Sequence, residues 1–327
     1  MSTIVTGCVA RPSASTSPPW QTDNMLRWRL AVSAVLIPLF VGLFWLDARL
    51  GDSAPILLAL VVCLAVRGAS EMVDLLWTRS FTPNRTIVSA CCVLVAAAAW
   101  WGRFGWMPIE IPWGHNTLAQ VMLAYSLTIL VLFLLATYRY REPGASMETL
   151  SAELLIVSYI GVLLGVAAQL RWVAGAKAGY LVIGSLVIVT KGGDVGAYFF
   201  GRLFGKRKMV PHLSPGKTWA GAVGALIGSA VSAIAWLHLA TPYFTPAGSP
   251  RWESPDWFSA AVYGLILGVT GLVGDLCESL IKRDVGKKDS ARLLPGFGGL
   301  LDLMDSVLYA GPIAYVLWKA LPLATWL

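Results

Sequence analysis

Charged residues are scarce in this chain, because they make up only 13% of its 327 residues. A water-soluble globular protein carries about 25%. Hydrophobic residues make up 57% of the chain and its mean hydropathy is +0.67. This balance excludes a soluble fold and predicts that the lipid bilayer is the solvent. The 32 glycines and 15 tryptophans agree, since glycine allows close helix contact in membranes and tryptophan favours their interfaces.

Several common catalytic signatures are also missing from the sequence. The three histidines form no H-E-x-x-H motif, and no G-x-S-x-G motif occurs, which argues against zinc and serine hydrolases. The five cysteines include no C-x-x-C spacing, so we interpret them as reduced, buried hydrophobic residues. Gly216-Lys217-Thr218 resembles the end of a P-loop, but Pro211 stands where that motif requires glycine.

Long apolar stretches fill most of the chain after residue 26. Residues 1–26 are rich in Ser, Thr and Pro and have no signal-peptide pattern, so we expect a disordered N-terminal segment followed by a polytopic membrane domain over 27–327. A membrane-spanning helix needs about 20 apolar residues. The sequence predicts an all-α integral membrane protein with nine such helices, at 28–47, 55–77, 86–101, 117–138, 152–172, 178–200, 218–240, 257–277 and 303–323.

The distribution of basic residues predicts the orientation of these helices. With the N-terminus inside, the inner segments hold 17 of the 25 Lys and Arg residues. Cytoplasmic loops are enriched in these residues, so an N-in, C-out topology follows. Attraction to anionic headgroups explains most of this charge. The inner connections 201–217 and 278–305 are the longest, and the second also carries acidic residues that lipid attraction does not require.

Ionisable side chains inside the predicted spans need a partner or a function, because each costs about 2.5–3.5 kcal/mol near mid-bilayer. Arg67, Glu71 and Asp74 share one helical face, and a structural ion pair is as good an explanation as a role in chemistry. Lys191 and Asp194 are one turn apart. For this pair we favour function, since Gly192, Gly193 and Gly196 beside them form a backbone that a ligand could approach closely.

The densest set of charges begins where the eighth predicted span ends. Asp275, Ser279 and either Lys282 or Arg283 recur at helical spacing and share a face, and Asp302 and Asp305 stand one turn apart after the loop. Carboxylate and hydroxyl oxygens suit Mg²⁺, while Lys and Arg suit phosphate. A charged loop whose side chains merely reach the interface is the simpler alternative. The pattern favours metal and phosphate chemistry at a membrane surface.

Two sequence blocks contain most of these charged residues. The first reads S-L-I-K-R at 279–283, K-D at 288–289 and P-G-F-G-G-L-L-D-L-M-D at 295–305. The second reads D-V-G-A-Y-F-F-G-R-L-F-G-K at 194–206, followed by S-P-G-K-T-W at 214–219. Both blocks resemble the phosphatidate cytidylyltransferase family, also called CDP-diacylglycerol synthase. The first is similar to the family's S-x-x-K-R, K-D and P-x-H-G-G-x-x-D-R-x-D, with the same spacings, and the second to its D-x-G-A-Y-F-x-G-R-x-F-G-K and S-P-x-K-T. The matches cover about residues 190–310.

Three positions depart from the family pattern. Phe297 replaces His, Leu303 replaces Arg and Ala220 replaces a common Glu. Transfer of a nucleotidyl group to an ionised phosphate needs no strong general base, because the attacking oxygen already carries negative charge. It needs positioning and neutralisation of the leaving pyrophosphate. We therefore expect activity despite the three departures.

The resemblance implies a reaction in which CTP and phosphatidate give CDP-diacylglycerol and pyrophosphate. It implies that Asp275 and Asp302 hold Mg²⁺, that a second cation could join it, and that Asp305 and Ser279 lie close by. The backbone of Gly298 and Gly299 would approach phosphate. The remaining implied site residues, which would neutralise charge or border the substrate cavity, are Lys282, Arg283, Lys288, Asp289, Asp194, Tyr198, Arg202, Lys206 and Lys217.

Alternatives remain open at this point. A CTP-dependent kinase of a polyprenol or another lipid alcohol would use similar groups, a transporter would explain Lys191 and Asp194, and an inactive relative would explain Phe297 and Leu303. Gly161 with Gly165, and Gly264 with Gly268, permit close helix contact within the chain or in a homodimer. No nucleic-acid partner is expected. The simplest location is a bacterial inner membrane, with the site facing the cytoplasm.

Overall fold

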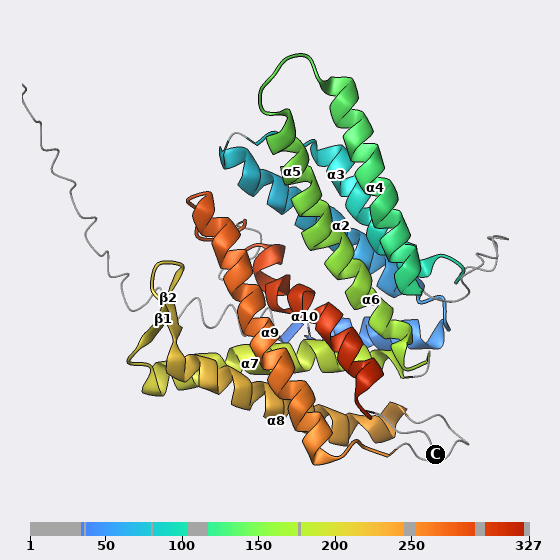
Figure 1. Ribbon diagram of the computed structural model, residues 1–327. Helices are drawn as coiled ribbons and strands as arrows, with labels where there is room; N and C mark the ends of the chain where they lie inside the picture. The colour runs from blue at the N-terminus through green and yellow to red at the C-terminus, as the bar shows by residue number, and fades with distance from the viewer. Residues whose placement is uncertain are drawn as a thin grey trace, which may run out of the picture.

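The computed structural model describes residues 34–35, 37–79, 81–103, 117–175, 178–244, 253–291 and 298–323. The predicted disordered segment, residues 1–26, lies outside these ranges. Most described residues are helical (Figure 1). After a helical stretch at 37–49, the elements are α2 (Pro55–Leu76), η1 (Trp77–Arg79), α3 (Arg85–Ala97), η2 (Ala98–Trp100), α4 (Thr117–Arg139), α5 (Ser146–Ile156), η3 (Val157–Val162), α6 (Leu163–Val173), α7 (Gly179–Phe204), β1 (Lys208–Val210), β2 (Ser214–Thr218), α8 (Trp219–Phe244), α9 (Trp257–Asp284) and α10 (Leu300–Ala320).

Among the described residues, seven helices are long and apolar enough to span a membrane. They are Pro55–Arg79, Leu118–Arg139, Ser146–Val173, Gly179–Phe204, Trp219–Phe244, Trp257–Asp284 and Leu300–Ala320. The third predicted span forms the shorter apolar helix Arg85–Trp100, and the first lies partly outside the described ranges. The protein is therefore a mostly helical, multi-pass membrane protein.

The predicted inner connection 201–217 is more ordered than a loop. Strands β1 and β2 pair antiparallel, with Lys208 opposite Thr218, and join α7 to α8. The backbone N–H of Trp219 donates to the carbonyl of Arg207 at 3.1 Å and closes the base of the hairpin. The all-α prediction thus fits the apolar helices but missed this hairpin.

The predicted span at 152–172 is one helix from Ser146 to Val173 with a π-helical turn, η3, in its middle. A Cβ atom added to Gly161 would lie 3.2 Å from the Cα of Cys92, and one on Gly165 would lie 3.2 Å from the Cα of Ala96. These glycines therefore allow contact with α3 inside the chain.

Helices α7 and α8 run side by side, and α9 crosses them (Figure 1). Their backbones touch: a Cβ on Gly196 would lie 2.2 Å from the carbonyl oxygen of Gly224, and one on Gly192 would lie 1.9 Å from the Oγ of Ser232. Of the three glycines interpreted as a backbone for close approach of a ligand, Gly192 and Gly196 instead serve the contact with α8, which occupies that space, whereas Gly193 lines the cavity described below.

Helix α9 packs on α8 through the second predicted glycine pair. A Cβ on Gly264 would lie 2.6 Å from the Cα of Ala230, and one on Gly268 would lie 3.0 Å from the Cβ of Ser229. Both glycine pairs on which the homodimer prediction rested are thus used within one chain. Asp256 is the N-cap residue of α9: its carboxylate accepts the N–H of Ser259 at 2.9 Å, and this bond lowers the pKa of Asp256.

Candidate active site

A cavity of about 650 Å³ lies where α7, β2, α8, α9 and α10 meet. Small residues on α8 and α9, such as Gly221, Ala225 and Gly268, leave the space open, and charged side chains line it. The predicted site residues that the structure brings to this cavity are Asp194, Tyr198, Arg202, Lys217, Asp275, Lys282, Asp302 and Asp305. Segments more than 100 residues apart in the chain therefore converge on one site.

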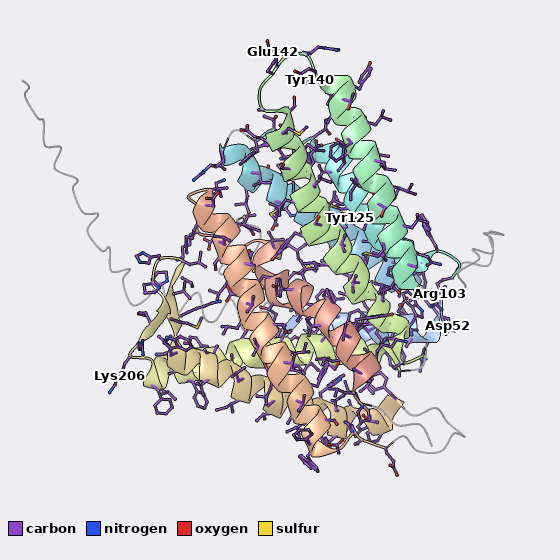
Figure 2. All side chains as sticks on the ribbon, viewed as in Figure 1. Asp52, Arg103, Tyr125, Tyr140, Glu142 and Lys206 are labelled. Atoms are coloured by element: carbon purple, nitrogen blue, oxygen red, sulfur yellow. The ribbon has the colours of Figure 1, made fainter. Side chains whose placement is uncertain are left out.

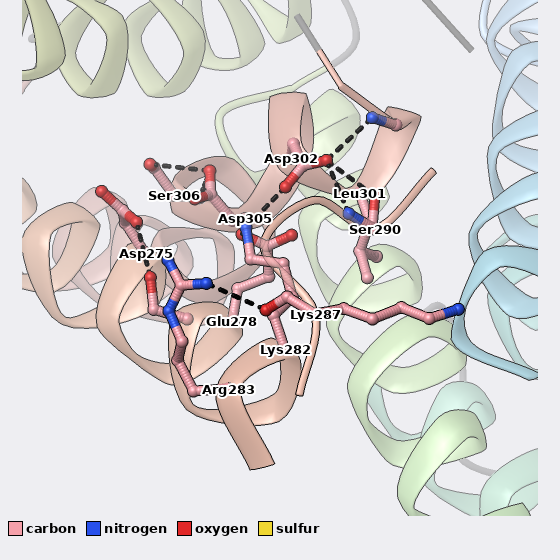
Figure 3. A network of polar contacts seen from close by, with 12 residues as sticks. Asp275, Glu278, Lys282, Arg283, Lys287, Ser290, Leu301, Asp302, Asp305 and Ser306 are labelled. Atoms are coloured by element: carbon pink, nitrogen blue, oxygen red, sulfur yellow. Dashed lines mark hydrogen bonds and ion pairs between the residues drawn. The ribbon is translucent and has the colours of Figure 1, made fainter. Parts of the chain in front are cut away.

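Three carboxylates form the centre of the site. Asp275, Glu278 and Asp305 each offer one oxygen atom, and these oxygens lie within 4.8 Å of one another (Figure 3). Glu278 and Asp305 are buried, and Asp275 is half-buried. Three carboxylates so close together repel one another unless a cation or proton joins them. Hard oxygen ligands in this number suit a divalent cation such as Mg²⁺.

One oxygen atom of Glu278 is available to a cation. Its Oε1 is buried and accepts no hydrogen bond from any residue that the structure describes, although Oε2 accepts from the Nζ of Lys282 at 2.7 Å. A buried, unsatisfied carboxylate oxygen is costly. The nearby Oδ1 of Asp305 accepts from the backbone N–H and the Oγ of Ser306, at 2.5 and 3.0 Å. The free oxygen of Glu278 is thus placed to take a ligand.

Lys282 connects this cluster to Asp302. Its Nζ lies 2.7 Å from Glu278 and 2.5 Å from the Oδ1 of Asp302, and the lysine side chain is only 10% exposed. The other oxygen of Asp302 accepts from the N–H and Oγ of Ser290 and from the N–H of Gly299, at 3.0, 2.8 and 2.8 Å (Figure 3). Both oxygens of Asp302 are therefore already occupied by donors.

A second lysine reaches the site from the hairpin. The Nζ of Lys217, on β2, lies 2.9 Å from the Oδ2 of Asp275, and the Oγ of Ser279 donates to Oδ1 of the same carboxylate at 3.4 Å. Of the residues predicted to share a face, Asp275 and Ser279 are thus in contact, and Asp275 and Lys282 line the cavity whereas Ser279 does not. Because Lys217 lies on β2, the position of this strand fixes where its charge lies.

Helix α7 contributes further polar groups to the lining of the cavity. The Nζ of Lys191 lies 2.9 Å from Asp194, so the predicted pair one turn apart is present. One turn further, Arg202 donates to the hydroxyl of Tyr198 at 2.7 Å. Asp194, Tyr198 and Arg202 line the cavity, and all three are exposed.

Other predicted residues lie away from the cavity. Arg283 points to the hairpin, where it donates to the carbonyl of Leu213 at 3.2 Å, and it also donates to the carbonyl of Lys287 at 2.9 Å. Three further residues, Lys206, Lys288 and Asp289, are exposed and do not line the cavity. Figure 2 shows Lys206 at the edge of the molecule.

The two predicted phosphate-binding glycines surround Asp302. The N–H of Gly299 donates to that carboxylate, and Gly298 has a φ of +88°, a conformation that favours glycine. Of the three departures, Phe297 lies outside the described residues, while Leu303 and Ala220 are partly buried and do not line the cavity.

Sequence reasoning missed Glu278, Ser290 and Ser306. Glu278 is three residues after Asp275 and four before Lys282, so helical spacing already placed it on their face. The family signature begins at Ser279 in this chain and so does not include Glu278. The serines contact carboxylates through geometry that no spacing predicts.

Comparison with known proteins identifies the family. A model described as the cytidylyltransferase family matches residues 27–321. The chain belongs to this family. The resemblance found in the two sequence blocks is therefore confirmed, and the match extends well beyond them.

Curated relatives in this family include proteins named phosphatidate cytidylyltransferase. The one from Haemophilus influenzae is 32% identical over 225 residues, covering 67% of this chain and 66% of the relative. The one from Chlamydia pneumoniae is 33% identical, covering 64% and 67%. The one from Brucella suis is 40% identical, covering 42% and 47%. This chain thus spans from about half to about two thirds of the length of these relatives.

Proposed function

We propose that this protein is a phosphatidate cytidylyltransferase, which converts CTP and phosphatidate into CDP-diacylglycerol and pyrophosphate for phospholipid biosynthesis. The observation that carries the proposal is the cavity among membrane helices in which three carboxylates face two lysines. The names of the curated relatives support the same reaction.

The carboxylate cluster fits a divalent metal ion. We assign Asp275, Glu278 and Asp305 as its ligands, because their oxygens converge and Glu278 has a free one. Asp302, which the resemblance assigns as a ligand, is not among the three converging carboxylates and lies 2.5 Å from the Nζ of Lys282, so we give it the role of anchoring Lys282. A bound Mg²⁺ would neutralise phosphate oxygens during the transfer.

In the transfer, a phosphate oxygen of phosphatidate forms a bond to the α-phosphorus of CTP. The bond from that phosphorus to the oxygen bridging to the β-phosphorus breaks, and pyrophosphate leaves. The phosphate nucleophile is already ionised, so no residue of the chain has to remove a proton. Lys217, Lys282 and Arg202 line the cavity and would balance the negative charge of the triphosphate and of the departing pyrophosphate.

The proposal places the site at the cytoplasmic side of a bacterial inner membrane, with nine helices in an N-in, C-out arrangement. CTP is available there, and phosphatidate presents its headgroup to that surface. The basic residues of the hairpin and of the α9–α10 connection support this orientation, since cytoplasmic segments are rich in Lys and Arg.

Transfer of labelled cytidylate tests this function. Protein purified in detergent is supplied with Mg²⁺, phosphatidate and CTP labelled on the α-phosphorus, and lipid is separated from water-soluble label. We expect label in the lipid fraction, lost with EDTA and reduced about a hundredfold or more in Asp275→Asn, because a ligand is removed. Asp284→Asn is the matched control, since Asp284 is an exposed carboxylate on the same helix whose nearest partner, Arg79, is 3.7 Å away.

Other results would point elsewhere. If lipid alcohols become phosphorylated from CTP labelled on the γ-phosphorus and no cytidylate moves, the protein is a lipid kinase. If well-folded protein transfers neither group, the proposed function is wrong. If Asp275→Asn and Asp284→Asn lose the same fraction of transfer activity, the carboxylate cluster has no role in the transfer.

A further inference from the structure

Glu71 on α2 is a fully buried carboxylate at the start of α10. The first N–H groups of a helix have no partner within it, and α10 begins after Gly299, which has no side chain to cap them. Glu71 fills this role from 229 residues away in the chain: its two oxygens accept the N–H groups of Leu300 and Leu301 at 3.1 and 3.0 Å. A negative charge is also favoured at this helix end.

The same carboxylate is one step from the candidate site. The Oγ of Ser290 lies 3.1 Å from Oε2 of Glu71 and 2.8 Å from Oδ2 of Asp302, and the next link is the 2.5 Å contact from Asp302 to Lys282. Figure 3 shows Ser290 beside Asp302, with Lys282 between Asp302 and the carboxylate cluster. A continuous polar network therefore runs from α2 to Glu278.

Close packing makes this network specific. A Cβ atom on Gly299 would lie 2.1 Å from the Oγ of Ser290 and 2.4 Å from Oε2 of Glu71. The φ of Gly299 is −85°, so its conformation does not require glycine. The absence of a side chain at this position therefore serves the approach of Glu71 and Ser290 to the backbone.

We propose that Glu71 is a positioning residue of this site: it fixes the N-terminus of α10 and, through Ser290, the place of Asp302 and hence of Lys282. This inference rests on the proposed function for its effect on catalysis, but its structural part stands independently. A carboxylate is needed because three donors, the N–H groups of Leu300 and Leu301 and the Nε of Arg67 at 3.1 Å, each offer a hydrogen atom to its two oxygens. The hydroxyl of Ser290 has one hydrogen atom, which it shares between Glu71 and Asp302. An amide would turn one NH₂ group toward a donor.

Glu71→Gln tests the proposal, with Asp74→Asn as its matched control. Asp74 lies about one helical turn after Glu71 in α2, is half exposed and pairs with Arg85. Asp74→Asn therefore makes the same chemical change, carboxylate to amide, at a residue outside the network. We expect Glu71→Gln to lower kcat by about ten- to a hundredfold with little change in the KM for CTP, because the reacting groups are misplaced while the cavity cations remain. Hydrogen exchange of the backbone at 298–303 should become faster only in Glu71→Gln.

A double variant separates positioning from general loss of stability. If Glu71 acts through Ser290, Glu71→Gln combined with Ser290→Ala loses no more activity than the worse single variant. If the losses multiply, or if Glu71→Gln matches Asp74→Asn within about twofold in kcat and in exchange, the proposal is wrong. Should Glu71→Gln fail to fold, Ser290→Ala, which keeps the carboxylate and the direct bonds to Leu300 and Leu301, must still lower kcat with little change in the KM for CTP for the proposal to stand. A wild-type protein without transfer activity would overturn the proposed function alone, because the exchange experiment does not depend on it.

Discussion

Two lysines in the cavity carry the same charge but differ in how deeply the carboxylates that they contact are buried. Lys282 is 10% exposed and is the cation between Glu278 and Asp302, whose side chains are 1% and 12% exposed. Lys217 contacts Asp275, a carboxylate that is 38% exposed and partly solvated. Removing Lys282 leaves two buried acids facing each other, whereas removing Lys217 leaves an acid that water can reach.

We therefore predict that Lys282→Met and Lys217→Met both lose transfer activity but differ in stability. Lys282→Met should cost about 3–5 kcal/mol of folding free energy, as expected when one partner of a buried ion pair is removed. Lys217→Met should cost about 1 kcal/mol or less. Thermal unfolding in detergent measures the difference, and similar melting temperatures for the two variants would contradict this view of Lys282.

The close packing of α7 against α8 depends on glycine residues, which have no side chain to separate the two helices. Gly196→Ala would push a methyl group into the carbonyl of Gly224, which cannot move without separating the helices. We predict a loss of about 1–3 kcal/mol in stability, together with lower activity because both helices line the cavity. Gly42→Ala is the control, since Gly42 is also helical but has open space around it. If the two variants melt alike, the close contact has no energetic importance.

Hydropathy predicted most of these helices because lipid forces each span to satisfy its own backbone. The starts of α7, α8 and α9 fall within about one residue of the prediction. Hydropathy does not predict structure that depends on contacts between distant segments. The hairpin before Trp219 and the π-helical turn at Val157–Val162 have no periodic pattern of apolar residues that would predict them. Asp275 and Lys282 were found by spacing within one helix, but the bonds from Glu71 to α10 cross 229 residues.

The arrangement of the chain in the membrane can be tested by labelling. Glu142 lies at one end of the helices and Asp52 and Arg103 at the other (Figure 2). In a variant without native cysteines, we predict that Glu142→Cys and Lys206→Cys react with an impermeant maleimide only from the cytoplasmic side. Asp52→Cys should react only from the outside, because one predicted span precedes it. Reaction of all three from one side would contradict the nine-helix, N-in topology.

The bond between α2 and α10 also has a consequence for how the protein is made. Chains are synthesised and folded from the N-terminus, so α2 enters the membrane long before Leu300 leaves the ribosome. Until then, of the partners of Glu71 that the structure describes, only Arg67 is in place. Insertion of α10 thus completes both the burial of this charge and the alignment of Asp302. A chain interrupted before α10 would have neither, so we expect activity only after α10 has been inserted.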